Sequence, residues 1–314
     1  MKKRLFVLVL ALAVVFTFSA VPGFAASKQV IQVSEKDYTI DSDGNEELNW
    51  SWKDTYEKGK LTKYTYSSIW YDYSYDDEGN ETRTKIKDVY TYTYNYKKNG
   101  LTGSVIIKKN NKKDGKRVYT YDKKKRTKTS TYYDYVNGKY KKESVTKYTY
   151  SSKKTTAVTD YVDKNTKDTK TVTNYDSKGR VKSYVYYEDG KKERTEIYTY
   201  SSKGILQKTK TTTTDGSYTN VTTYDKKGNI IKDVDTYADS KYVTEYDYYS
   251  NGLYKKIVRT NTNTYNGEKT TTKDTEIYKY SNWYGSTKKY PKTVKIYNAD
   301  NELIGKEVRT YKKI

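Results

Sequence analysis

Residue types that usually perform covalent or metal chemistry are scarce in this chain. Its 314 residues include no His and no Cys. This composition excludes a Ser-His-Asp triad, a cysteine nucleophile, a disulfide framework and a zinc site with the usual ligands. The 39 Asp and Glu residues remain, because two facing carboxylates could act as they do in glycosidases.

Two acidic segments are candidates for metal binding or catalysis. The run Asp41-Ser42-Asp43-Gly44-Asn45 begins like a calcium loop, but it lacks the further spaced acids and the final Glu of an EF-hand. The run Asp76-Asp77-Glu78 falls within a repeated turn motif. The other acids lie in turns or alternate with Lys, and no spacing brings two of them into one pocket. We therefore predict no enzyme activity, no catalytic residue, no cofactor and no metal site.

The first 25 residues have the three parts of a secretory signal peptide. Lys2, Lys3 and Arg4 precede an apolar run, and Gly23-Phe24-Ala25 supplies the small residues of a cleavage site. We predict cleavage before Ala26; the alternative is an uncleaved membrane anchor. Cleavage would lower the charge from +22 to +19 and leave no transmembrane segment in the mature chain. The protein is therefore expected to be secreted, and either extracellular or associated with the cell wall.

The 61 Lys and Arg residues make a polyanion the first candidate ligand. The cations are densest in the middle of the chain, where Lys123, Lys124, Lys125 and Arg126 are the candidate binding residues. Nucleic acid is not expected as a partner of a secreted protein, so anionic cell-wall polymers or glycans are the predicted partners. The alternative is that the cations only keep a sheet soluble and protect its edges.

The four Trp residues form a second set of candidates. Trp50 and Trp52 are two positions apart and would share one face of a strand, while Trp70 and Trp283 lie in other Tyr-rich segments. Aromatic side chains among polar neighbours suit stacking against a glycan. The alternative is that these rings pack in the core or cap the terminal repeat.

A repeat of about 25 residues indicates which elements position these candidates. An aromatic residue is followed by Asp or Ser, two polar residues and Gly, as in Tyr175-Asp176-Ser177-Lys178-Gly179-Arg180. Other copies start at Tyr75, Tyr200 and Tyr224, with weaker ones at Ile40, Tyr96, Tyr121, Tyr150, Tyr248, Tyr280 and Tyr297.

A second kind of turn lies midway between successive copies. Asp-Gly and Asn-Gly pairs supply the positive φ angles that tight hairpins need. They occur at Asp114-Gly115, Asn137-Gly138, Asp189-Gly190, Asp215-Gly216 and Asn266-Gly267. The segments between turns alternate with period two; in Val89 to Tyr96, four Tyr lie on one face.

These patterns predict an all-β fold, an antiparallel hairpin meander of about 18 to 20 strands forming one domain over residues 26–314. The sheet could be open, spiral or closed into a barrel. The alternative is a disordered chain, because aliphatic residues are sparse and the net charge is high. Abundant Tyr and Thr, the near absence of Pro and the repeat itself favour a folded sheet.

The Tyr-Asp-x-x-Gly-Arg form of Tyr175 to Arg180 resembles the YD repeat of RHS-type proteins. The resemblance is strongest from Tyr75 to Leu253, and Lys125 and Lys154 stand where the repeat has Gly. Short secreted YD-like proteins are the nearest kind, which implies a hairpin-sheet architecture and an extracellular location but no activity. We therefore predict a non-catalytic surface or extracellular protein that binds anionic polymers or glycans through a basic, Tyr-rich sheet. The alternative is a soluble module that binds a ligand in a pocket inside a closed sheet.

Overall fold

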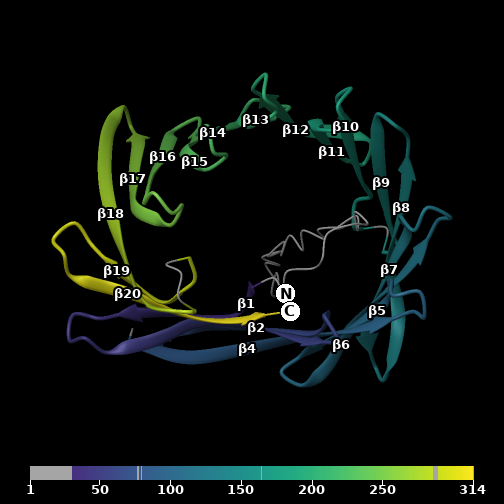
Figure 1. Ribbon diagram of the computed structural model, residues 1–314, viewed down its shortest axis with the longest axis horizontal. Helices are drawn as coiled ribbons and strands as arrows, with labels where there is room; N and C mark the ends of the chain where they lie inside the picture. Colours follow the sequence, from purple (N-terminus) through teal and green to yellow (C-terminus); the bar gives the residue numbers. More distant parts are fainter. Residues whose placement is uncertain (1–29, 76–77, 79, 164, 286–288, 314) are drawn as a thin grey trace.

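The computed structural model describes residues 30–313 apart from 76–77, 79, 164 and 286–288 (Figure 1). It contains twenty strands, which confirms the all-β prediction. No helix among the described residues is long and apolar enough to cross a membrane. The predicted signal peptide, residues 1–25, lies outside the described residues, so it remains a prediction.

The strands follow one another along the whole described chain. They are β1 (Val30–Ile40), β2 (Glu46–Glu57), β3 (Lys60–Tyr75), β4 (Glu81–Tyr96), β5 (Thr102–Lys109), β6 (Lys112–Tyr121), β7 (Thr127–Val136), β8 (Lys139–Tyr150), β9 (Lys154–Tyr161), β10 (Thr169–Tyr175), β11 (Val181–Glu188), β12 (Lys191–Tyr200), β13 (Leu206–Thr213), β14 (Tyr218–Tyr224), β15 (Ile230–Tyr237), β16 (Ser240–Tyr248), β17 (Tyr254–Tyr265), β18 (Glu268–Trp283), β19 (Pro291–Tyr297) and β20 (Leu303–Lys313).

The sheet closes on itself. Each strand pairs antiparallel with the next, and β1 also pairs with β20, from Val30 opposite Lys313 to Thr39 opposite Gly305. In Figure 1 the purple first strands and the yellow last strand lie side by side, and the closed sheet encircles the centre of the view. Closure pairs each described strand with a neighbour on both sides over part of its length, which protects most of the sheet edge from aggregation, while the tip of the β3–β4 hairpin extends beyond its neighbours. Of the three forms that the sequence left open, the barrel is the one observed.

The hairpin turns confirm most of the predicted Asn-Gly and Asp-Gly pairs. Both residues have positive φ at Asn137-Gly138, Asp189-Gly190 and Asn266-Gly267, as a type I′ turn requires. The prediction at Asp114-Gly115 is wrong. The turn between β5 and β6 lies at Asn110-Asn111, with φ of 49° and 64°.

Gly115 instead lies inside β6, and the reason is a close approach. A Cβ atom added there would stand 2.6 Å from the hydroxyl oxygen and 2.9 Å from a ring carbon of Tyr132. Only a residue without a side chain fits beneath that ring, so this glycine serves packing rather than a turn.

Three weaker copies of the Tyr-containing motif depart from the predicted alignment. The copy at Tyr280 is not a turn, because β18 continues to Trp283 and Tyr280 pairs with Val294. The turn after β8 is one residue short: the Ser151 N–H donates to the Lys154 carbonyl, so Lys154 closes the turn and does not replace the Gly. After β16, the Asp position of the motif is held by Tyr249, which is neither Asp nor Ser, because the Tyr249 N–H donates to the Leu253 carbonyl.

A β-bulge recurs immediately before the motif Tyr. The register shifts between Thr120 and Tyr121, Thr199 and Tyr200, and Asp247 and Tyr248. Equivalent shifts precede Tyr96, Tyr175, Tyr224 and Tyr297. A bulge bends the strand and increases its twist, so its repetition around the sheet favours closure.

The two faces of the sheet carry different residues. One face is rich in Tyr: on β4, Tyr92 stands opposite Tyr64 of β3 and Ile107 of β5. The other face carries more Lys: on β13, Lys210 stands opposite Ile197 of β12 and Val221 of β14. Side chains converge on the concave face of a curved sheet, so the more buried Tyr-rich face is the inner one. Full burial is limited: one cluster of Ile257, Tyr278 and Val294 is packed against Tyr246, Tyr280 and Ile296. Cross-strand pairs and backbone ladders must therefore contribute much of the stability.

Candidate functional site

The Asp of the repeated motif forms a closed network of hydrogen bonds within its turn. Oδ1 of Asp176 accepts from the Lys178 N–H at 2.9 Å and the Arg180 N–H at 3.0 Å. Oδ2 accepts from Nε of Arg180 at 2.7 Å. Asp41, Asp122 and Asp225 repeat this arrangement, and Asn298 makes the same two backbone contacts. The motif is thus a turn built by local side-chain bonds.

The motif Tyr ties each turn to the neighbouring strand. The hydroxyl of Tyr121 donates to the Thr102 carbonyl at 2.8 Å, and that of Tyr200 donates to the Val181 carbonyl at 2.9 Å. Tyr96, Tyr150 and Tyr248 make the equivalent bond. The Tyr and the Asp of the motif therefore have structural roles.

The candidate polyanion-binding residues separate into two kinds in the structure. Arg126 belongs to the turn, because its Nε lies 2.7 Å from Oδ2 of Asp122 and its guanidinium lies 4.3 Å from the centre of the Tyr150 ring. Lys123, Lys124 and Lys125 are exposed at the tip of the same turn, between β6 and β7. They remain candidates for binding a ligand, whereas Arg126 is occupied.

The topology gathers these lysines with others that are distant in sequence. A meander reverses direction at every strand, so the turns that follow β4, β6, β8, β10, β12 and β14 all lie at the same end of the sheet. Each exposes at least one Lys. We name this set the basic rim: Lys97, Lys98, Lys123, Lys124, Lys125, Lys153, Lys154, Lys178, Lys203, Lys226 and Lys227.

The acidic residues of these turns offset little of the charge of the basic rim, because Asp122 and Asp176 form ion pairs with Arg126 and Arg180, which are not rim residues. Asp122, Asp176 and Asp225 are held inside their turns by the bonds described above. The turns at the opposite end carry exposed acids: Asp189 lies beside Lys191, and the turn at Asp215 has no lysine. The sequence alone indicated one turn of the basic rim as a binding site, the turn that carries Lys123 to Arg126. The grouping of the other turns with it could not be recognised, because it depends on which turns of the meander lie at the same end of the sheet.

The candidate glycan-stacking residues lie at two separate places in the structure. Trp50 stands opposite Ser68 and Asp37, and Trp52 opposite Tyr66 and Glu35, so both indoles lie on the inner face of β2. Trp70 lies two residues beyond Ser68 on the same face of β3 and is 45% exposed. Trp283 lies apart at the end of β18, with its ring centre 6.3 Å from that of Tyr280.

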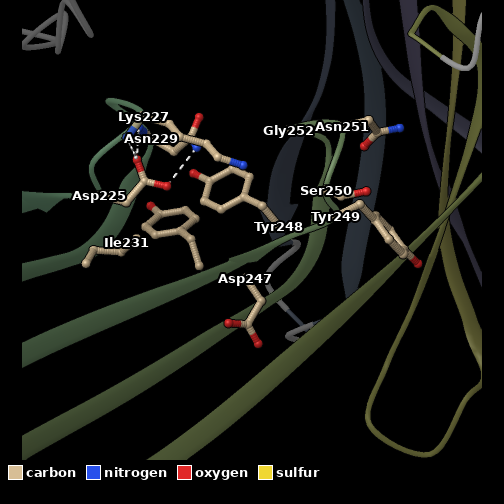
Figure 2. A pocket seen from close by; sticks show the side chains of 11 residues that line it. Asp225, Lys227, Asn229, Ile231, Asp247, Tyr248, Tyr249, Ser250, Asn251 and Gly252 are labelled. Carbon is tan, nitrogen blue, oxygen red and sulfur yellow. Dashed lines mark hydrogen bonds between the residues drawn. The ribbon is translucent and has the colours of Figure 1, made fainter.

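A cavity of about 440 Å³ lies between two neighbouring turns of the repeat (Figure 2). Its wall includes Asp225, Asn229, Tyr248 and Gly252. Figure 2 shows that Asp225 faces its own turn, where it accepts from the N–H groups of Lys227 and Asn229 at 2.7 and 2.9 Å. Because these groups already satisfy one another, the cavity follows from the spacing of the turns and offers little for a ligand.

Buried charges lie where the sheet closes. Arg309 on β20 forms ion pairs with Glu307 and, at 3.6 Å, with Glu35 on β1. Burial raises the pKa of Glu307, while the Arg309 charge opposes that shift. These side chains face inward beside Trp52, because Glu35 stands opposite both Trp52 and Arg309.

Neighbouring carboxylates occur on the inner face of the sheet at two places. Asp233 and Asp235 both accept from Nδ2 of Asn220, at 2.9 and 3.0 Å. Burial and then the charge of Asp134 raise the pKa of Glu143. No group of acids among the described residues could hold a metal ion. The predicted absence of enzyme activity is not tested by these observations.

Comparison with known proteins gives no family assignment. No family model matches the chain. No curated protein matches it either. The resemblance to YD repeats therefore stays a prediction at the level of the family.

Solved structures are similar only in part. A porin-like protein from Bacteroides uniformis is 12% identical, over 89% of this chain and 96% of that chain, with a TM-score of 0.39. A pore form of the Photorhabdus luminescens Tc holotoxin is 12% identical, over 85% of this chain and 16% of that one, with a TM-score of 0.28. A Bacteroides fragilis protein of unknown function is 13% identical, over 67% of this chain and 94% of that one, with a TM-score of 0.15. Similarity at these scores supports no functional inference.

Proposed function

We propose that this is a secreted, non-catalytic protein that binds anionic cell-wall polymers through the basic rim. The observation that supports this proposal is the convergence of lysines from six alternate turns of the chain at one end of the closed sheet. Lysine keeps its charge at any ordinary pH, so the attraction persists in any extracellular medium.

Many weak contacts would act together in such a complex. A single exposed lysine gains little from one anionic group, but a long polymer that reaches one rim contact raises the effective concentration for the next. Screening acts within about 10 Å at 0.1 M salt, so the attachment should be reversed by salt. The basic rim is continuous over several neighbouring hairpins, which suits a linear polyanion better than a small ligand.

A matched pair of variants tests the proposal. In the rim variant, Lys123, Lys124, Lys226 and Lys227 are changed to Glu. In the control, Lys112, Lys139, Lys191 and Lys269, which are exposed at the opposite end, are changed in the same way. Both variants change the net charge equally, so any difference between them reports position. Arg126 and Lys125 are left unchanged because they shape the turn.

The measurement is sedimentation of purified mature protein with cell-wall material over a range of salt concentrations. We expect wild type to sediment at low salt and to be released at high salt, and the rim variant to be released at a clearly lower salt concentration than the control. Equal losses in the two variants would show that net charge alone acts. A wild-type protein that stays in solution at low salt would contradict the proposed function.

A further inference from the structure

Three of the four Trp residues come together on the inner face of β2 and β3. In cross-strand register, Trp52 stands beside Tyr66 and then Tyr90, and Trp50 beside Ser68 and then Asp88. A third row holds Asp54, Tyr64 and Tyr92. We name the set of Trp50, Trp52, Trp70, Tyr64 and Tyr66 the aromatic platform.

The aromatic platform has the dimensions of an extended binding surface. Neighbouring strands lie about 4.8 Å apart and alternate residues of one strand about 6.8 Å apart, so its rings cover a continuous area rather than a single point. Trp70 is 45% exposed, while Trp50 and Trp52 are half-buried. A wide ring with one accessible face and polar neighbours favours a ligand that has both apolar C–H faces and hydroxyl groups.

Acceptor oxygens surround the rings. Among the described residues no donor lies within hydrogen-bonding distance of Oδ1 of Asp54, although this oxygen is buried. The other oxygen, Oδ2, accepts from the Tyr56 hydroxyl at 3.3 Å. A buried acceptor without a donor is costly, and because Oδ1 exposes almost no surface, it gives the aromatic platform a polar floor and is not itself a ligand contact. Burial raises the pKa of this carboxyl group, which agrees with its incomplete solvation.

The charges near the aromatic platform select against anionic ligands. Glu35, Asp37, Asp54 and Asp88 share its face and outnumber the two cations there, Arg309 and Lys109, which pair with Glu35 and Asp88. The lysines of the same strands, Lys53, Lys63 and Lys87, alternate to the outer face. A polyanion bound at the basic rim would therefore meet carboxylates here.

We propose that the aromatic platform is a second binding site, which takes a neutral oligosaccharide by stacking sugar rings on Trp70 and its neighbours. This site is independent of the basic rim, because it uses other residues, another face of the sheet and uncharged contacts.

Tryptophan fluorescence tests the proposal directly, because Trp50, Trp52 and Trp70 are three of the four Trp in the chain. The full-length mature protein is titrated with cellohexaose and, separately, with chitohexaose. We expect a saturable change in fluorescence with at least one sugar, and an affinity that does not change between low and high salt. No change with either sugar at millimolar concentration would overturn the proposal.

Single substitutions locate the site. Trp70→Ala removes an exposed ring and should weaken binding about tenfold, the effect of losing roughly 1.4 kcal/mol of ring contact. Trp52→Phe keeps an aromatic ring beside Tyr66 and should weaken binding less than Trp70→Ala, and the circular dichroism spectrum and melting temperature of each variant would show that the fold is kept. Trp283→Phe should leave the affinity unchanged, because Trp283 lies apart from the aromatic platform. An affinity that depends on Trp283 and not on Trp70 would contradict the assignment.

Discussion

At the scale of single residues, Lys125 adopts a backbone conformation that its neighbours in the repeat assign to glycine. Its φ is 61°, and Gly179 and Gly228 occupy the equivalent positions at 75° and 88°. The left-handed region is unfavourable for a residue with a Cβ atom. We expect Lys125→Gly to raise the free energy of unfolding by roughly 0.5–1 kcal/mol in urea denaturation.

The adjacent Lys124 is the control for this prediction, because its φ is not positive. Lys124→Gly makes the same chemical change, and the added freedom of the unfolded chain should lower stability slightly. If both substitutions shift the urea midpoint in the same direction, strain at Lys125 is not the cause.

Gly115 is needed for packing and not for its backbone angles, because the missing side chain leaves space for the Tyr132 ring. Gly115→Ala would place Cβ within 3 Å of the Tyr132 ring. Overpacking of this kind costs about 1–3 kcal/mol, which thermal or urea unfolding would detect. In a Tyr132→Ala background the same substitution should cost almost nothing. A full cost in that background would mean that the ring contact is not responsible.

At the scale of the element, the repeated turn makes stability depend on acid pH. Hydrogen bonds from the Asn229 side chain and N–H lower the pKa of Asp225, and the N–H and side chain of Arg180 do the same for Asp176. Bonds from Asn45, side chain first, lower the pKa of Asp41. A carboxyl group with a lowered folded-state pKa stabilises the fold above its unfolded pKa, near 3.9, and that contribution is lost as the pH falls through the folded value.

Asparagine at these positions should remove the pH dependence while it keeps the acceptor oxygen, as Asn298 already does in its own turn. We predict that the urea midpoint of wild type falls between about pH 5 and pH 2 and that the Asp41→Asn, Asp176→Asn, Asp225→Asn variant loses less over the same range. Parallel curves for the two proteins would show that these turns do not contribute to acid unfolding.

The sequence predicted the elements well where their structure is local. The bonds of Asp176 connect residues within four positions, and Asn137-Gly138 adopts its turn through its own φ preferences, so both could be read from short segments. Asp114-Gly115 failed because Asn110 competes for the turn and binds across to β4: its N–H donates to the Val89 carbonyl, and its side chain accepts from the Val89 N–H. The basic rim and the aromatic platform depend on strand direction and register, which no single segment contains.

At the scale of the whole molecule, closure depends on the contact between β1 and β20. Arg309 lies there against Glu307 and Glu35, and all three side chains are largely buried. Arg309→Met would leave two carboxylates without their cation, which costs about 3–5 kcal/mol for a buried pair. We expect a strongly lowered urea midpoint and, because two strand edges become available, concentration-dependent association in size-exclusion chromatography.

Arg194 offers the control for this change. It is exposed on the inner face of β12, and Arg194→Met should change stability by less than about 0.5 kcal/mol. If the two substitutions lower the free energy of unfolding equally, the ion pairs between β1 and β20 contribute no more to stability than an exposed arginine does.

We propose that the closed sheet separates two binding functions, a polyanion at the basic rim and a neutral sugar on the inner face. The most direct measurement is the affinity of the mature protein for soluble poly(glycerol phosphate) at several salt concentrations, with and without chitohexaose or cellohexaose at a concentration that saturates the fluorescence change. We predict that the affinity falls steeply with salt, that the sugar leaves it unchanged, and that the rim variant loses more of it than the control from the opposite end. An affinity that is flat with salt, or a polymer that the neutral sugar displaces, would contradict the account.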